Sequence, residues 1–160
     1  MIGQIIRLNK LTRKNRNCVV AALDAGEFFG PYQGIVNLAS VCKTLNESDA
    51  ILIEPGAIEI CKEAFLGDDP PILITRLNWN SDYCFQWNYN KSQTVKTISP
   101  YIALALGADI GIASLSINTQ NESNDAKNIK IFSEIIEEAK KVGLPIIGEI
   151  YPPLKKYSEE

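Results

Sequence analysis

The sequence predicts an α/β fold in which short parallel strands alternate with helices. Five apolar runs begin near residues 18, 50, 72, 109 and 145, and their length and continuous hydrophobicity are typical of strands buried on both faces. The segments between them place apolar residues at helical spacing or contain the glycines and prolines of turns. The mean step between runs is about 32 residues, close to one βα unit of an eight-fold barrel of about 250 residues.

In the first two units, each strand ends at an acidic residue. The apolar run over 17–24 predicts the first strand, and a glycine-containing loop follows it. Apolar residues at helical spacing then predict a helix over 35–45. The run over 50–54 predicts the second strand, which a Pro-Gly pair ends before a short helix over 57–65.

The remaining three units follow the same order. The third strand is predicted over 71–77, the fourth over 109–117 and the fifth over 145–151. Between the last two strands, the clearest amphipathic stripe of the chain predicts a helix over 129–142. Gly143 then fits the position of a C-terminal cap.

A long loop is predicted after the third strand. Residues 78–92 are rich in Asn, Ser and aromatic residues and have no clean period, and loops of this length are often functional. A helix over 94–106 follows, with a kink or a late start expected at Pro100. The loop residues that we expect either to cover a site or to form an interface are Trp79, Trp87 and Tyr89.

Two architectures fit five strands in 160 residues. One is a partial (βα)₈ TIM barrel of about five βα units. The alternative is an open five-stranded doubly wound sheet, which would be complete at this length. In both, residues 1–160 form a single α/β domain.

Composition excludes several classes of function. The net charge of −3 and the pI near 5.1 argue against a nucleic-acid partner. No apolar run approaches the roughly 18 residues of a membrane span, and residues 1–17 lack a signal-peptide core, so a cytoplasmic protein is expected. The chain has no histidine, which removes Ser-His-Asp and Cys-His catalysis and His-ligated metals. The four cysteines form no CxxC pair and are expected to be reduced core residues, and no metal or other cofactor is predicted.

Polar side chains gather where the predicted strands end. In both architectures the active site lies at the C-terminal ends of the strands, and several polar groups that converge there favour a polar small-molecule site. Acids at these positions can also cap helices or form an ion pair with the arginine among them. The basic stretch over 7–16 is interpreted as a solvated segment. The candidate residues are Asp24, Glu54, Arg76, Asn78, Ser116, Glu149 and Tyr151.

A series of short motifs carries a resemblance to a known family. They are Arg7-Leu8, Leu23-Asp24-Ala25-Gly26, Gly30-Pro31-x-x-Gly34, Arg76-Leu77, Leu106-Gly107-Ala108-Asp109, Gly143-Leu144-Pro145 and Ile150-Tyr151-Pro152. In this order the chain resembles the archaeal-type class I aldolases, which include fructose-bisphosphate aldolases and aminodideoxyheptulosonate synthases. The resemblance covers the first five strands of that family's barrel and favours the partial barrel over the open sheet.

The resemblance implies Schiff-base cleavage or formation of carbon–carbon bonds in a sugar phosphate or another ketone. Asp24 matches the family's acid after the first strand, and Tyr151 matches its tyrosine after the fifth. The sequence departs from the family at Ala25, where histidine is usual, and at Pro153-Leu154, where Arg-Gly is usual.

The family's lysine lies on the sixth strand and its phosphate-binding groups on the seventh and eighth. The resemblance therefore implies that this chain is inactive alone and needs a completing chain. Lys155 and Lys156 lie just past the fifth predicted strand in a polar tail, and either would need a desolvated or cationic pocket to replace the family's lysine. Exposed strand edges predict a homo-oligomer or a barrel-completing partner. An inactive binding subunit and a fragment of a longer aldolase are the alternatives.

Overall fold

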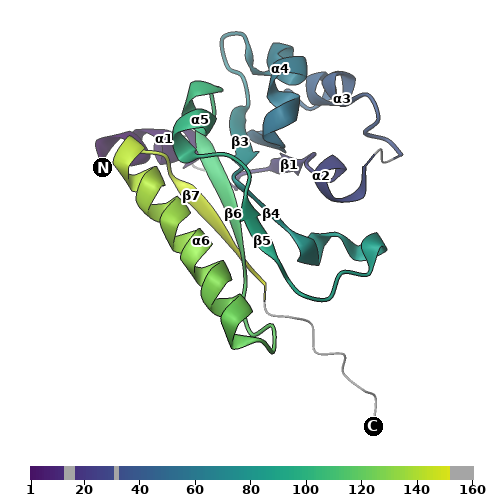
Figure 1. Ribbon diagram of the computed structural model, residues 1–160. Helices are drawn as coiled ribbons and strands as arrows, with labels where there is room; N and C mark the ends of the chain where they lie inside the picture. Colours follow the sequence, from purple (N-terminus) through teal and green to yellow (C-terminus); the bar gives the residue numbers. More distant parts are fainter. Residues whose placement is uncertain (13–16, 31–32, 152–160) are drawn as a thin grey trace.

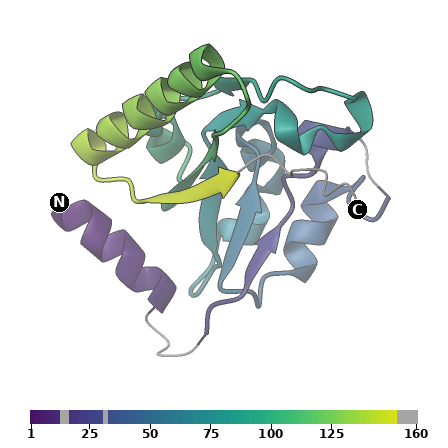
Figure 2. The same cartoon turned by 90° about the horizontal axis from the view of Figure 1, so that it is seen from below.

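The computed structural model describes residues 1–12, 17–30 and 33–151. Its main sheet has five parallel strands in chain order (Figure 1). These strands are β1 (Val20–Ala22), β2 (Ala50–Ile53), β3 (Ile72–Arg76), β6 (Ile110–Ser116) and β7 (Ile146–Tyr151). A doubly wound sheet reverses its strand order at a switch point, and this sheet does not, so the open doubly wound alternative is wrong. The sheet is a curled half-barrel with β1 and β7 at its two edges (Figure 2).

The helices cover one face of the sheet. The helices α3 (Leu38–Thr44), α4 (Ile58–Cys61), α5 (Pro100–Ala105) and α6 (Glu122–Val142) belong to this layer, together with the 3₁₀ turns η1 (Pro55–Ala57) and η2 (Lys62–Phe65). Strand residues such as Ile51 and Ile53 are completely buried among side chains of this layer. The helix predicted over 57–65 is therefore one α-helical turn between two 3₁₀ turns.

The opposite face, here called the inner face, changes from apolar to polar along the strands. Toward the N-terminal ends of the strands, this face is a buried apolar cluster of Ala50, Leu52, Ile72, Ile74, Ile110 and Ile112. Side chains alternate between faces with a period of two, so the same face continues into polar residues at the strand ends. The register supports this, because Arg76 pairs with Ile112 and Ser114 pairs with Glu149. The polar residues therefore lie next to an apolar cluster, whose packing holds their strands together.

The N-terminus differs from its predicted form. Residues Ile2–Thr12 form a helix, α1, whose residues are exposed or half-buried, while residues 13–16 lie outside the described part of the chain. The helix is held by polar contacts at the N-terminal end of the sheet: Arg7 Nη1 donates to the Gly143 carbonyl at 3.2 Å, and Lys10 forms an ion pair with Asp109 at 2.7 Å. None of the residues of α1 is fully buried, but half-buried Leu11 packs against the apolar cluster of the inner face.

The predicted loop over 78–92 is the larger part of a β-hairpin. Strands β4 (Asn78–Asn80) and β5 (Thr94–Lys96) pair antiparallel, with the 3₁₀ turns η3 (Ser81–Tyr83) and η4 (Phe85–Trp87) between them. The helix predicted over 94–106 consequently starts late, at Pro100, where Ser99 caps it by accepting a hydrogen bond from the Ile102 amide. A short helix, α2 (Gly26–Phe29), also follows β1.

The cysteines are free, but they do not all lie in the core. Cys42, Cys61 and Cys84 are buried, whereas Cys18 is exposed, contrary to its predicted place. Within the described residues, no helix has the length and apolar character needed to cross a bilayer.

One strand glycine allows β6 to pack closely against its neighbours. A Cβ atom at Gly111 would lie 2.7 Å from Leu77 Cδ1 and 2.8 Å from Ile146 Cδ1. We expect Gly111→Ala to lower the free energy of unfolding by about 1–3 kcal/mol, the usual effect of overpacking a core. Urea denaturation checks this, with Gly56→Ala as the control because no atom lies within 4 Å of its added Cβ. Equal stability of the two variants would contradict the prediction.

Candidate active site

A buried arginine organises the C-terminal ends of the strands. Arg76 is the last residue of β3, and only 2% of it is exposed. Its Nε and Nη2 atoms both lie 2.7 Å from Asp24 Oδ2, just beyond β1. Its Nη1 atom donates to Glu149 Oε2 of β7 at 2.8 Å and to Ser114 Oγ of β6 at 2.7 Å. One guanidinium thus connects three strands and pairs with two carboxylates.

Glu149 accepts several hydrogen bonds on a single oxygen. Besides Arg76, the hydroxyl of Tyr83 donates to Oε2 at 2.7 Å and the hydroxyl of Ser114 donates at 3.0 Å. Burial by itself raises the pKa of Glu149, but Arg76 and the hydroxyl donors outweigh it, so the pKa is lowered. Glu149 is therefore held as a carboxylate.

Two aromatic rings cover the guanidinium. Arg76 Cζ lies 5.2 Å from the ring centroid of Phe28 and 5.1 Å from that of Tyr83. The cation therefore faces two π surfaces in addition to its ion pairs. Burial raises the pKa of Tyr83, so its hydroxyl stays protonated and acts as a donor to Glu149.

Two further glutamates belong to the site, and burial favours their neutral forms. Glu27 Oε2 lies 4.0 Å from Arg76 Nε, and this oxygen and Glu54 Oε2 are buried without a hydrogen-bond partner. Burial raises the pKa of Glu27 to about 7, with Arg76 opposing it and Asp24 and Glu54 adding to it. Burial, and then Asp24, also raise the pKa of Glu54, against a backbone hydrogen bond that lowers it. Within the described residues, these acids are not arranged to hold a metal ion.

Tyr151 stands at the open end of this cluster. It lies two residues after Glu149 on β7 and so shares the inner face. Its ring meets that of Tyr83 edge-on, with centroids 4.9 Å apart, and 39% of the residue is exposed. Its hydroxyl is thus on the solvent side of the buried ion pairs.

The other two predicted site residues attach the hairpin to β6. The Asn78 side chain exchanges two 2.8 Å hydrogen bonds with the Ser114 backbone, as a neighbouring strand would. Ser116 accepts from Asn80 Nδ2 at 2.7 Å and donates to Asp82. Both are completely buried, and these bonds occupy the polar atoms that a substrate would contact.

The structure thus brings Asp24, Arg76 and Glu149 into direct contact and places Glu54 and Tyr151 beside them. It also adds three residues that the pattern of strand ends does not identify: Glu27, Tyr83 and Ser114. Ser114 could be found from its spacing of two from Ser116 on one strand. Glu27 and Tyr83 belong to connections whose course no periodicity predicts.

The arrangement defines a class of protein. A curled parallel βα sheet whose polar residues gather at the C-terminal strand ends is one side of a TIM barrel. Its solved structural neighbours include archaeal fructose-1,6-bisphosphate aldolases. One crystal structure of an archaeal fructose 1,6-bisphosphate aldolase matches 96% of this chain with a TM-score of 0.74 and 18% identity. Another, with the catalytic lysine covalently bound to the carbinolamine intermediate of the substrate, matches 96% with a TM-score of 0.71 and 19% identity.

Sequence comparison leads to the same group. The chain is 34% identical over 155 residues to an uncharacterized aldolase of Saccharolobus solfataricus, a match that covers 93% of this chain. It is 26% identical over 153 residues to 2-amino-3,7-dideoxy-D-threo-hept-6-ulosonate synthase 1 of Archaeoglobus fulgidus, with 95% covered. No family model matches the chain. The resemblance to archaeal-type class I aldolases is therefore confirmed.

Each match covers only part of the relative's length. The chain spans 56% and 55% of the two curated proteins and 59% of each of the two aldolase structures.

Proposed function

We propose that this chain provides the acid-bearing side of a Schiff-base aldolase that acts on a ketone or a sugar phosphate. The observation that carries the proposal is the position of Asp24 and Tyr151. They lie at the ends of β1 and β7, around the ion pairs of Arg76. These are the two positions at which the resembled family has its acid and its tyrosine.

The chemistry needs an amine, an electron sink and proton carriers. A lysine amine adds to the ketone carbon to give a carbinolamine, and loss of water gives an iminium ion. When the neighbouring carbon–carbon bond breaks, its electron pair moves toward the iminium nitrogen, and the hydroxyl proton of the departing aldehyde passes to a base. The iminium is itself the electron sink, so the proposal requires no cofactor.

The residues of this site suit the handling of protons and hydroxyl groups. Arg76 contacts Oδ2 of Asp24 through two nitrogen atoms at 2.7 Å, which fixes that carboxylate at the end of β1. Tyr151 is exposed enough for its hydroxyl to reach a bound molecule. We assign the proton transfers to Asp24 and the orientation of a substrate hydroxyl to Tyr151, with Glu54 and Glu149 lining the same inner face.

The amine is assigned to the part of the barrel that would follow β7. A sixth strand would pair with the outer edge of β7, whose Ile150 is half exposed, and would bring its lysine next to Tyr151. The proposal holds whether that strand comes from the same polypeptide, from a second copy or from another chain. The buried thiols are compatible with a reducing compartment, and we propose a cytoplasmic location.

Borohydride trapping with dihydroxyacetone phosphate tests the proposal. The chain is incubated alone and with a polypeptide that carries the remaining strands of a relative, and mass spectrometry locates the reduced adduct. We expect a lysine adduct in the completed barrel. Absence of an adduct under both conditions would overturn the aldolase proposal and leave a binding or interaction role.

In the completed barrel, Asp24→Asn is expected to lower turnover by about 10²–10⁴-fold, because it removes the group that accepts the proton. Steady-state kinetics with a coupled aldehyde assay measures this. The matched control is Asp68→Asn, an exposed residue of the β2–β3 connection. Equal turnover of the two variants would remove Asp24 from the catalytic role.

A further inference from the structure

The β4–β5 hairpin carries a pocket that the proposed carbon–carbon chemistry does not use. Its volume is about 360 Å³, within the range of small-molecule sites. Trp79 forms one wall. The side chains alternate along β4, so Trp79 points away from the face on which Asn78 and Asn80 bond to β6. Tyr89 forms the second wall, with its ring centroid 6.2 Å from that of Trp79 and the two planes at 77°.

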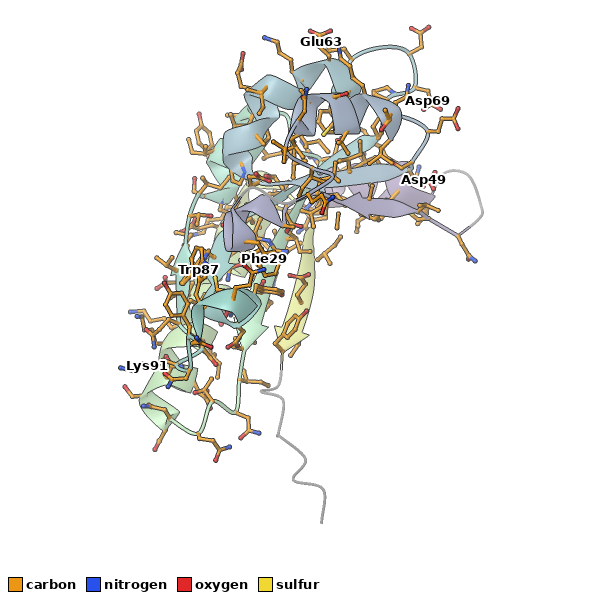
Figure 3. The ribbon with its side chains drawn as sticks, turned by 90° about the vertical axis from the view of Figure 1, so that its right-hand side faces the viewer. Phe29, Asp49, Glu63, Asp69, Trp87 and Lys91 are labelled. Carbon is orange, nitrogen blue, oxygen red and sulfur yellow. The ribbon has the colours of Figure 1, made fainter. Side chains whose placement is uncertain are left out.

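The two walls are supported from behind. Trp79 packs against the buried cluster of Phe28, Tyr83 and Cys84, and Trp87 meets Tyr89 edge-on at 5.7 Å. The 3₁₀ turn η4, which contains Trp87, contacts α2. In Figure 3, Trp87 is seen beside Phe29 of α2, and Lys91 lies further along the hairpin. Trp79 and Tyr89, here called the aromatic corner, are therefore held in place by side chains of the packed structure.

Buried amides of α6 fix the backbone at the rim of the pocket. Asn124 Nδ2 donates to the Lys91 carbonyl at 2.6 Å, and Asn128 Nδ2 donates to the Ser92 carbonyl at 2.8 Å. Gln93 Nε2 donates in turn to Asn124 Oδ1 at 2.6 Å. Asn128 is completely buried and Asn124 is 8% exposed. A rim held in this way is preorganised, which reduces the entropy lost when a ligand binds.

The lining combines aromatic faces with uncharged hydrogen-bonding groups. Its surface is mostly carbon, and Lys91 is the one charged residue among the described residues that line it. Of its uncharged polar residues, Ser81 accepts from the Gln93 amide and the Gln93 side chain bonds to Asn124 and Lys127, so the side chains offered to a ligand are those of Asn88 and Asn90. Aromatic faces carry negative charge density that attracts the C–H faces of a saturated ring, while hydroxyl and amide groups exchange hydrogen bonds with ring hydroxyls. We propose that this pocket binds a neutral sugar ring.

The single charged residue in the lining favours a neutral ligand over a phosphate. A phosphate group is bound by several cationic or backbone donors, and a single exposed lysine does not provide them. The proposed ligand is thus an uncharged glycoside or the uncharged part of a larger saccharide. All residues that line the pocket belong to the hairpin, and ligand binding there can be measured without aldolase activity, so the inference can be tested independently of the aldolase proposal.

Saturation-transfer NMR on the full chain tests this inference, with methyl glucoside as the probe. We expect transfer from the aromatic protons to the ring C–H protons and a Kd near 1 mM, as is typical of a small neutral ligand. Tyr89→Ala is expected to weaken binding at least tenfold, and Tyr89→Phe, which keeps the aromatic face, to bind as the unchanged chain does. The matched control is Tyr101→Ala, because Tyr101 is an exposed tyrosine of α5.

Three results would overturn the proposal. The first is no saturable binding at concentrations about a hundredfold above the expected Kd. The second is binding of adenosine that equals or exceeds that of the glucoside, which would assign the corner to flat aromatic rings. The third is equal weakening by Tyr89→Ala and Tyr101→Ala, which would locate the sugar elsewhere.

Discussion

Replacing Arg76 by methionine is expected to lower the free energy of unfolding by about 3–5 kcal/mol at neutral pH, which is the usual loss when one partner of a buried ion pair is removed. The guanidinium is completely buried and lies 2.7–2.8 Å from oxygens of Asp24 and Glu149. Methionine fills a similar volume but leaves both carboxylates without their cation. Urea denaturation measures the effect.

The same variant is expected to depend on pH in a characteristic way. Without Arg76, the pKa of Glu149 loses the partner that lowers it, so this carboxyl is protonated more easily. The stability difference from the unchanged chain should therefore shrink as the pH falls from 7 to about 4. Arg76→Lys is the control, because lysine keeps the positive charge but not the several N–H donors of the guanidinium. Its free energy of unfolding should fall by less than that of Arg76→Met. A difference between Arg76→Met and the unchanged chain that stays constant with pH would show that packing, not charge, makes Arg76 important.

The second large effect is expected at Glu27, with the opposite sign. Its pKa in the folded chain is about 7, against 4.5 for an ordinary glutamate. Between these values the folded state binds more protons than the unfolded state, so the free energy of unfolding falls as the pH rises. Above pH 7 the folded chain carries an ionised, buried Glu27 at full cost. Glu27→Gln removes that charge and should stabilise the chain at pH 8 by about 2 kcal/mol, allowing for partial exposure.

Thermal or urea unfolding between pH 4 and pH 8 measures this difference. The two chains should be similar in stability near pH 4, where Glu27 is neutral in both states, and should diverge above it. Glu137→Gln, at an exposed position of α6, is the matched control and should show no such divergence. Destabilisation by Glu27→Gln at pH 8 would mean that the ion pair with Arg76 outweighs the burial of the charge.

Much of the fold can be predicted from the sequence because three of the five strands of the main sheet, β2, β3 and β6, are buried runs. The residues of β2 and β3 are buried throughout, so their sequences are continuously apolar up to the polar strand ends. The step of one βα unit then predicts the barrel architecture. The strand order could not be read from this pattern alone, and the resemblance to the aldolases decided between the two architectures.

The hairpin could not be predicted because its stabilising contacts are polar. Asn78 and Asn80 are completely buried, yet asparagine in sequence is typical of loops. Their amides pair with Ser114 and Ser116 on a strand that lies more than thirty residues further along the chain. Local periodicity carries no signal for such long-range hydrogen bonds.

The candidate site was predictable in its location but not in its internal contacts. Strand ends identify Asp24, Arg76 and Glu149, since parallel strands bring their carboxyl ends together. Which acids pair with the arginine depends on the connections, and these place Glu27 and Tyr83 against it. The helix α1 was missed for a related reason: none of its residues is fully buried, and it contacts the sheet through Leu11 and a few polar side chains.

The uninterrupted order of the strands also has a consequence for how the chain folds. Each strand of the main sheet pairs only with the sheet strand that precedes it and the sheet strand that follows it along the chain, in the order β1-β2-β3-β6-β7. No strand has to wait for a distant partner, so the sheet can grow by one strand at a time as the polypeptide is synthesised. Sequential pairing of this kind keeps the loops to be closed short and favours rapid assembly. The strands β1 and β7 remain at the two edges of this sheet.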